Sequence, residues 1–222
     1  AAVEKAAKLQ DYIDRNLVRA TTAKSALSRV NQLERMDKLE KPVPPPKPPR
    51  FVFSYDTQPY ERVVDAQHFD LTIDGKTLIR DGCFTLLRGE KCALTGENGT
   101  GKTTLLKYLL RSDEKVQHAK FVRIAYYDQE NADLDPEDRV LDAFWGKNSL
   151  MTQTDARKLL AQVGIEAEDV NKKVKELSGG LRAKLELALL ESRRGNVLFL
   201  DEPTNHLDLP AREALEEALK RF

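Results

Sequence analysis

Hydrophobic and polar positions divide the chain into two parts with different periodicity. In residues 1–41 the apolar residues recur mostly at steps of three and four, which is typical of one stripe along an α-helix. The stripe consists of Leu9, Ile13, Leu17, Ala20, Leu27, Val30 and Leu33. Because residues 1–41 contain neither glycine nor proline, they are predicted to form one long helix. Such a stripe needs an apolar partner, so we expect that partner to lie upstream in a longer protein.

Residues 51–222 alternate short apolar runs with helical stretches, a pattern that indicates an α/β domain. The predicted strands are 69–73, 83–87, 91–94, 122–127 and 197–200, and the predicted helices are 103–111, 181–192 and 210–221. The run at 197–200 is apolar at every position, as in a parallel strand buried on both faces. Residues 135–176 are polar and predicted mostly helical, with Val140, Leu141, Phe144 and Trp145 expected to be buried.

A proline-rich spacer separates the two parts. Six of the ten prolines lie between Pro42 and Pro49, where they favour a stiff polyproline II segment that cannot continue a helix. The predicted organisation is therefore a helix over 1–41, a spacer over 42–50 and an α/β domain over 51–222.

Charge gives only local information. Lys and Arg number 36 and so do Asp and Glu, so the net charge does not argue for nucleic acid or membrane as a partner. Between Arg15 and Leu33, however, the chain has no acidic residue and carries four basic ones, Arg15, Arg19, Lys24 and Arg29. Two interpretations stay open, a solvated helix face and a stripe that contacts RNA phosphates.

Cysteine content and hydropathy exclude several classes of protein. Two cysteines, Cys83 and Cys92, rule out a disulfide scaffold and a four-thiolate zinc site; we expect both thiols to be reduced and in the core. The mean hydropathy is −0.53, and no apolar run approaches the ~20 residues that span a bilayer. A soluble, cytoplasmic chain without a membrane partner is predicted. His68 and His118 lack metal-ligand spacing and are interpreted as surface or packing residues.

Residues 96–103, Gly-Glu-Asn-Gly-Thr-Gly-Lys-Thr, match the pattern G-x-x-x-x-G-K-[ST] and lie between an apolar run and a predicted helix. Glycines allow such a loop to turn its backbone N–H groups toward phosphate oxygens, and the helix dipole adds positive potential. Lys102 is predicted to reach the β- and γ-phosphates, and the Thr103 hydroxyl to hold Mg²⁺. We call residues 96–103 the phosphate loop.

Two further motifs follow. The predicted strand 197–200 ends at Asp201 and Glu202, which would serve as a metal ligand and as the group beside the water that attacks the γ-phosphate. The signature segment, residues 177–180 (Leu-Ser-Gly-Gly), precedes the predicted helix 181–192. Ser178 can cap that helix, and the two glycines leave its first amides open to an anion.

The motifs in this order resemble an ATP-binding cassette ATPase: GENGTGKTT, then Gln129 after an apolar strand, LSGG, and VLFLDEPTNHLD. The ending EPTNHLD is similar to the ABC-F branch, whose members lack transmembrane domains and join two cassettes by a helical linker. The resemblance implies a P-loop cassette with a mixed β core and a helical subdomain, preceded by a long α-helix. Residues 1–41 would be the second linker helix, and 51–222 most of the second cassette, ending before the family's switch histidine.

The resemblance also implies roles for individual residues. Nucleotide would be held by Gly96, Glu97, Asn98, Gly99, Thr100, Gly101, Lys102, Thr103 and Thr104, and Mg²⁺ by Thr103, Gln129 and Asp201. Glu202, Lys102 and Gln129 would be catalytic. Ser178, Gly179 and Gly180 would contact ATP on an upstream cassette packed head to tail, with residues 205–208 crossing the interface. Ile73 stands where the family has an adenine-stacking aromatic residue, and Phe69 or Tyr60 are the candidate substitutes.

The expected function is an ATPase that acts on the ribosome in translation, with the linker helix contacting ribosome or tRNA. The chain alone is expected to bind ATP without being competent for turnover. One alternative is the cytoplasmic ATPase subunit of an ABC membrane transporter, and another is an interaction module that binds nucleotide without hydrolysing it.

Overall fold

The computed structural model describes residues 48–222 apart from 74, 129–133 and 149, together with residues 8, 10–12, 14, 15, 28 and 30. The chain forms two compact units, residues 1–46 and 47–222. The described residues of the first unit are all helical, and in it Arg15 pairs with the exposed Asp11 at 3.0 Å. The predictions for Arg19, Lys24, Arg29 and the rest of the linker helix fall outside the described residues. No helix among the described residues is both long and apolar enough to cross a membrane.

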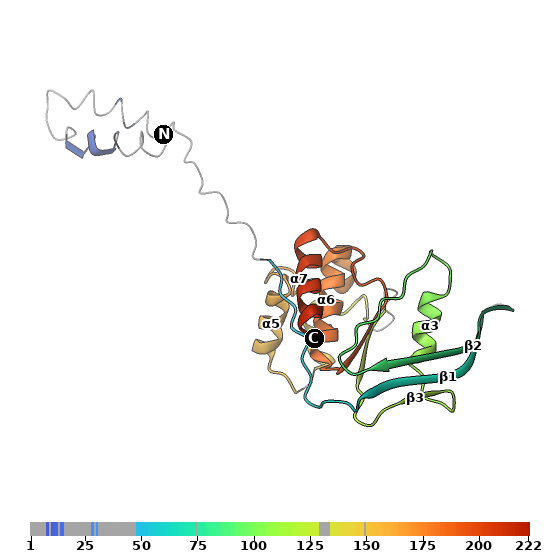
Figure 1. Cartoon of the computed structure of the whole chain (residues 1–222). Helices are drawn as coiled ribbons and strands as arrows, with labels where there is room; N and C mark the ends of the chain where they lie inside the picture. Colours follow the sequence, from blue (N-terminus) through green and yellow to red (C-terminus); the bar gives the residue numbers. More distant parts are fainter. Residues whose placement is uncertain are drawn as a thin grey trace. The chain divides into compact units, whose positions relative to one another are not determined.

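In the second unit, an antiparallel sheet contains β1 (Arg62–Ile73), β2 (Lys76–Leu87) and β3 (Val116–His118) in the order β2-β1-β3 (Figure 1). A bulge in β1 explains how its long sequence keeps one buried face. Val64 and Ala66 are buried, the register shifts between Ala66 and Phe69, and Phe69 is buried in turn. His68 lies in this shift with a φ of 49°. The extra residue restores the alternation that would otherwise turn Phe69 to solvent.

A separate parallel pair joins β4 (Ile124–Tyr127) to β5 (Val197–Leu200), with Tyr127 opposite Leu200. The helix α3 (Lys102–Leu109) covers the antiparallel sheet. Leu109 of α3, Val64 of β1 and Phe199 of β5 share one hydrophobic cluster. This cluster packs the second half of α3 and the strand β5 into the same body.

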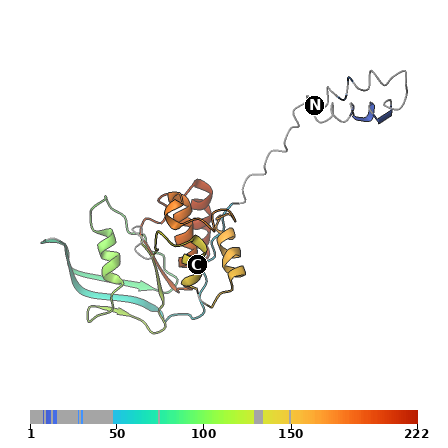
Figure 2. The same ribbon diagram turned by 180° about the vertical axis from the view of Figure 1, so that it is seen from behind.

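The second core lies among the helices, which gather at the end of the unit away from α3 (Figures 1 and 2). The helical elements are α4 (Val140–Gly146), α5 (Gln153–Gln162), the 3₁₀ turn η1 (Val174–Glu176), α6 (Gly179–Ser192) and α7 (Leu209–Arg221). Leu185 and Leu187 of α6 are fully buried against this core. The motif-bearing helix is therefore fixed by packing along most of its length.

Within residues 51–222 the structure confirms the expected helices 103–111, 181–192 and 210–221 and the expected strands, except the strand at 91–94. Residues 91–95 have no regular secondary structure, are exposed, and pair with no described strand. Within the described residues, β4 and β5 are each other's only parallel partners, so the apolar run at 91–94 has no ladder to join. Apolar composition alone does not distinguish a strand from an extended loop.

Three side chains expected in the core are exposed. Cys92 lies in the exposed segment 91–95. Cys83 is exposed on β2, whereas Phe84 and Leu86 of the same strand are partly buried against the hydrophobic cluster. Trp145 is 38% exposed because its indole N–H donates to the carbonyl of Met151 at 2.7 Å at the surface. Aromatic and sulfur-containing residues are often, but not always, interior.

Candidate functional site

The phosphate loop has the backbone that its glycines predict. Gly99 and Gly101 have φ values of 79° and 94°, in the region that side chains with a Cβ avoid. Gly101 is the N-cap of α3, so the loop leads directly into a helix N-terminus. The Thr100 hydroxyl closes the turn by donating to the Glu97 carbonyl at 2.8 Å. The loop is almost wholly exposed, which leaves it accessible to a ligand.

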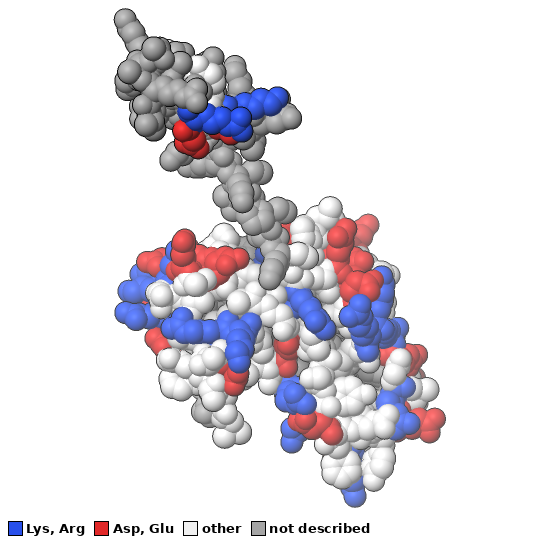
Figure 3. All heavy atoms as spheres, turned by 90° about the vertical axis from the view of Figure 1, so that its left-hand side faces the viewer, with Lys and Arg blue, Asp and Glu red and all other residues white. Residues whose placement is uncertain are grey.

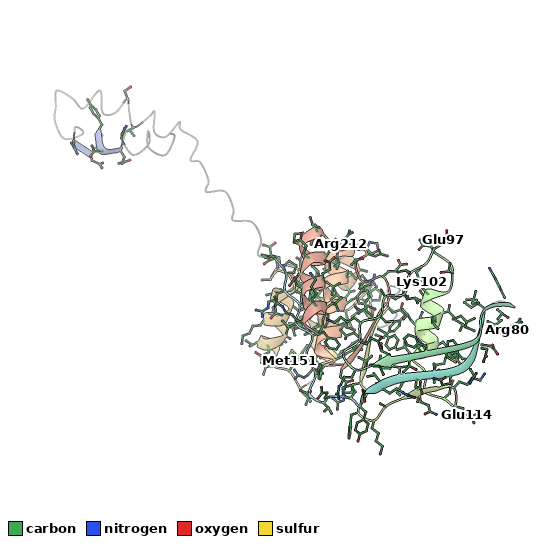
Figure 4. The ribbon with its side chains drawn as sticks, in the orientation of Figure 1. Arg80, Glu97, Lys102, Glu114, Met151 and Arg212 are labelled. Atoms are coloured by element: carbon green, nitrogen blue, oxygen red, sulfur yellow. The ribbon has the colours of Figure 1, made fainter. Side chains whose placement is uncertain are left out.

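Lys102 folds back over this loop. Its Nζ donates to the carbonyl oxygens of Gly96 at 3.0 Å and of Glu97 at 2.8 Å. Figure 4 shows Lys102 and Glu97 together at the start of α3, far from Arg80 on β2. The ammonium group is thus held where a phosphate chain lying on the loop would meet it. Exchanging two neutral carbonyls for charged oxygens would strengthen its hydrogen bonds.

Thr103 and Asp201 meet although they are 98 residues apart in the sequence. The Thr103 hydroxyl donates to Asp201 Oδ2 at 2.6 Å, and Asp201 is only 6% exposed. The backbone N–H of Asp201 donates to the carbonyl of Tyr127 at 3.2 Å, which extends the β4–β5 pairing by one residue. The first turn of α3 and the acidic end of β5 therefore face one another.

The oxygen atoms of Thr103 and Asp201 suit Mg²⁺, which prefers one or two carboxylates completed by phosphate and water oxygens. Among the described residues, no group of three or more His, Cys, Asp or Glu could hold a metal on its own. The donor set therefore fits a magnesium ion that arrives with a nucleotide.

Glu202 follows in a tight turn. Its φ is 47°, a left-handed value that costs a residue with a Cβ about 1 kcal/mol or more. Its carboxylate Oε2 accepts a hydrogen bond from Asn205 Nδ2 at 2.6 Å, and its carbonyl accepts from the Asn205 N–H at 3.1 Å. Glu202 is exposed, so its carboxylate is open to solvent one residue after the buried Asp201.

The signature segment packs on the loop that contains His206. Ser178 is the N-cap of α6 and accepts from the Leu181 N–H at 3.3 Å, as predicted. A Cβ placed on Gly180 would lie 3.0 Å from the His206 carbonyl, and one on Gly179 would lie 3.5 Å from the His206 ring. Any side chain at Gly180 would therefore push this loop away.

The loop is fixed at its other end as well. Asp208 caps α7 through the Ala211 N–H at 2.9 Å and pairs with the buried Lys184 of α6 at 2.9 Å. The bond from Lys184 lowers the pKa of Asp208. The start of α7 and the middle of α6 are thus held together.

The structure bears differently on Gln129 and on the candidate adenine-stacking residues. Gln129 falls outside the described residues. Phe69 is 2% exposed and stacks on Tyr108 with ring centroids 5.0 Å apart, so it offers no free face to adenine. Ile73 lies beside the loop, with Cδ1 3.9 Å from the position of a Cβ on Gly101. Tyr60 is exposed and packs edge-to-face on Phe121. Among the described residues, no hydrogen bond or ion pair joins residues 178–180 to the phosphate loop.

Sequence reasoning missed Tyr127 and Glu186. The Tyr127 carbonyl holds Asp201, and the residue lines the same small hollow as Glu186 of α6. Burial raises the pKa of Glu186 to about 7 and also raises the pKa of Tyr127. The available signal was an acid within the apolar run Leu185–Leu190, where an ionised side chain needs partners.

The comparisons with known proteins agree with this geometry. The family described as ABC transporter matches residues 79–205, and a second family with the same description matches residues 1–53. The fold is similar to the ATP-binding cassette MJ0796 in a dimeric post-hydrolysis state bound to ADP and Pi, with a TM-score of 0.58. That similarity covers 71% of this chain and 82% of the other at 19% identity.

Three curated relatives are similar in sequence. YdiF of Bacillus subtilis (strain 168) is 43% identical over 96% of this chain and 34% of its own length. The ribosome protection protein VmlR of the same organism is 34% identical, covering 77% of this chain and 32% of its own length. The energy-dependent translational throttle protein EttA of Mycobacterium tuberculosis (strain CDC 1551 / Oshkosh) is 36% identical, covering 72% and 30%. The chain spans about a third of the length of these relatives, and it belongs to the ABC-F family of ATP-binding cassette proteins, with the mixed α/β fold of a P-loop cassette.

Proposed function

We propose that this chain carries one ATP-binding half of a two-cassette ATPase that acts on the ribosome. The observation that carries the proposal is the meeting of Thr103 with Asp201 beside the phosphate loop. It brings a hydroxyl, a buried carboxylate and a helix N-terminus to one point, which is the set of groups that Mg-ATP requires. Membership of the cassette family supports the same activity.

In this proposal the backbone of residues 96–101 cradles the phosphates, and Lys102 leaves the Gly96 and Glu97 carbonyls to contact the β- and γ-oxygens. Thr103, Asp201 and Gln129 would hold Mg²⁺, which neutralises the charge that develops on the phosphate oxygens. Thr104, in the first turn of α3, is the last of the residues proposed to hold the nucleotide.

Glu202 is proposed to orient the water that attacks the γ-phosphate. Its carboxylate is held by Asn205, so the loop that follows β5 determines where it points. Movement of that loop would then change the position of Glu202 relative to the phosphates. The loop also contacts Gly180 through His206, which places the signature segment in contact with the same turn.

Ser178, Gly179 and Gly180 are proposed to complete the ATP site of an upstream cassette, packed head to tail. The absence of bonds between residues 178–180 and the chain's own phosphate loop among the described residues fits this assignment. A single cassette would then bind ATP but lack half of each composite site. We therefore propose that the chain alone binds nucleotide with little turnover.

A role in translation is proposed from the relatives named for ribosome protection and translational throttling. On the face shown in Figure 3, basic and acidic side chains of the second unit are mixed, so that face offers no single-sign surface for RNA. We assign RNA contact instead to Arg15, Arg19, Lys24 and Arg29. The cytoplasmic location expected from the sequence stays a prediction.

Calorimetry with Mg-ATP on the 222-residue chain tests the nucleotide site. Lys102→Ala should lower ATP affinity at least tenfold, because the phosphates lose a fixed cation. Lys158→Ala, which removes an exposed lysine of α5, is the matched control and should bind as the parent does. Equal affinities for the two variants would contradict the phosphate-loop assignment.

Ribosome co-sedimentation of the full-length protein tests the partner. Changing Arg15, Arg19 and Arg29 to Glu should weaken ribosome binding, and the remaining binding should depend less steeply on salt because fewer phosphates are neutralised. Undiminished binding would remove these arginines from the contact. Co-purification with an integral membrane protein would instead favour the transporter alternative.

A further inference from the structure

The end of the proline-rich spacer is fastened to the helical part of the second unit. Phe51 is 4% exposed and belongs to the helical core, and Pro49 is buried as well. Figures 1 and 2 both show this part of the chain at the helical end of the unit. We call residues 49–52 the strap. Connections between units are usually exposed and make few contacts, so this anchoring calls for a reason.

Backbone groups of the strap bond to two helices. The Arg50 N–H donates to the carbonyl of Gln162, the last residue of α5, at 2.9 Å. The side-chain Nε2 of Gln162 donates back to the Arg50 carbonyl at 3.2 Å. Two residues further on, the Val52 N–H donates to Glu191 Oε2 of α6 at 3.0 Å. The strap is therefore held by the end of α5 and the end of α6.

Helix α6 carries the strap and the signature segment at opposite ends. Ser178 caps its N-terminus, whereas Glu191 lies in its last turn. The thirteen residue steps between them correspond to about 20 Å along a helix axis. Leu185 and Leu187, between the two ends, are fully buried, so packing prevents the helix from bending freely. A displacement of one end is thus passed to the other.

A buried lysine gives a second route to the strap. Lys184 pairs with Asp208 at 2.9 Å, at the end of the loop proposed to cross the interface. The position of a Cβ on Gly164 would lie 3.8 Å from Lys184 Nζ and 3.6 Å from Pro49 Cβ. One side chain of α6 therefore faces both the interface loop and the turn on which the strap rests.

The strap has no comparable connection to the phosphate loop. Leu109 of α3 belongs to the cluster around the antiparallel sheet, whereas Phe51 belongs to the helical core. Among the described residues, no hydrogen bond or ion pair joins the strap to the phosphate loop or to α3. The spacer thus enters the second unit on the side of the signature segment.

We propose that the strap couples the spacer, and the linker before it, to α6, so that the linker responds to the signature segment rather than to the chain's own phosphate loop. Since the signature segment is proposed to contact ATP on an upstream cassette, that nucleotide would control the linker. This inference rests on the proposed two-cassette function.

Loosening the strap in the full-length protein tests the coupling. Glu191→Met removes the acceptor for Val52, and Gln162→Met removes the side-chain bond to Arg50, each with a side chain of similar length. In the double variant, ATP affinity and ATP turnover should stay within about twofold of the parent. The ratio of ribosome affinities with and without Mg-ATP, measured by co-sedimentation, should fall by at least half. A parental ratio would overturn the proposal.

Two further variants show whether the bond itself matters. Glu191→Gln keeps an oxygen that can accept from Val52, so it should restore most of the ratio that Glu191→Met loses. Glu213→Met, on an exposed residue of α7, is the matched control and should behave as the parent does. If Glu191→Gln is as defective as Glu191→Met, the bond to Val52 does not carry the coupling.

Amide hydrogen exchange on the 222-residue chain tests the anchoring directly. The Arg50 and Val52 amides should exchange slowly in the parent. Glu191→Met should speed exchange at Val52 at least tenfold, the factor expected for one lost hydrogen bond to a charged group. The Leu187 amide should stay slow, which shows that the variant is folded. Rapid exchange at Arg50 and Val52 in the parent would refute the strap.

Exchange in the full-length protein separates this proposal from the proposed function. Saturating Mg-ATP should change the exchange rate at Val52 if α6 transmits the state of the site. Ribosome binding that ignores ATP, together with a changed rate at Val52, would refute the role in translation and leave the strap. An unchanged rate with ATP demonstrably bound would overturn the strap, whatever the ribosome assay shows.

Discussion

The two sides of the proposed ATP site are built differently. The phosphate loop is exposed and left-handed at two glycines, and among the described residues Lys102 bonds only to the carbonyl oxygens of Gly96 and Glu97. The acidic side, in contrast, presents Asp201 from a strand end, buried and held by both Thr103 and Tyr127. Nucleotide must therefore organise the first side, whereas packing has already organised the second.

This difference separates binding from chemistry. Groups on the loop side gain charged partners only when phosphate arrives, so they should determine affinity. Groups on the acidic side are positioned beforehand, and pre-positioned groups contribute most where charge develops during reaction. Variants on the two sides should accordingly differ in which quantity they change.

Glu202→Gln should have the largest effect on ATP turnover and is the strongest test of the separation between ATP binding and ATP hydrolysis. In the full-length protein, we expect ATP affinity within about threefold of the parent and ATP turnover lower by about 10²–10⁴-fold, the usual contribution of a positioned acid–base group. Steady-state hydrolysis and calorimetry measure the two quantities. Glu213→Gln, on an exposed residue of α7, is the control. Parental turnover in Glu202→Gln would exclude Glu202 as the water-positioning group.

Alanine at two glycines of the loop should give intermediate effects. A Cβ on Gly101 would clash with Leu78 Cδ1, whereas a Cβ on Gly99 would meet nothing within 4 Å. Both changes carry the left-handed penalty of about 1–2 kcal/mol; Gly101→Ala must also displace Leu78. We expect Gly101→Ala to weaken Mg-ATP binding about tenfold and Gly99→Ala less, both measured by calorimetry.

Adding Leu78→Ala to Gly101→Ala is the internal check. If the clash is real, the added cavity in Leu78→Ala should remove the excess loss and leave a defect similar to that of Gly99→Ala. A Gly99→Ala variant that binds more weakly than Gly101→Ala would show that backbone N–H exposure, rather than packing under the N-cap, governs the loop.

The sequence predicted the short-range features of the candidate site better than the contacts between segments that are distant in the chain. The glycine spacing predicted a loop with positive φ values that leads into a helix, and Ser178 was correctly predicted as a cap, because such features depend on neighbours within a few residues. The run at 197–200 was also correctly interpreted as a parallel strand. These patterns carry their own geometry.

Contacts between distant segments were not predictable in the same way. Tyr127 and Glu186 line one small hollow although they share no motif, and only an acid in an apolar helix hinted at this proximity. The strand expected at 91–94 failed because a strand needs a neighbour, which apolar composition does not supply. The prediction that Trp145 and Cys83 are buried was wrong, because the face on which a residue lies depends on packing that periodicity describes only on average.

Breaking an exposed ion-pair cluster away from the site should have the smallest effect, and the effect is on folding stability. It tests whether exposed groups are in general weakly fixed. Glu137 bonds to Lys173 at 2.9 Å and to Lys175 at 2.6 Å, and these bonds lower its pKa to about 2. A depressed acid pKa stabilises the folded chain above the unfolded value of 4.5, and that contribution disappears as the pH falls from 4.5 toward 2.

Glu137→Gln should therefore cost a little stability at pH 7 and nothing near pH 2, with Glu213→Gln flat throughout. Urea unfolding of the 222-residue chain at several pH values measures the difference between each variant and the parent, and 0.5 M salt should shrink it because exposed pairs are screened. A loss that persists at high salt and low pH would mean that Glu137 acts by packing its side chain rather than by charge. In that case an exposed side chain would be fixed by packing, as the buried Asp201 is. Exposure alone would then not explain why the phosphate loop needs nucleotide to organise it.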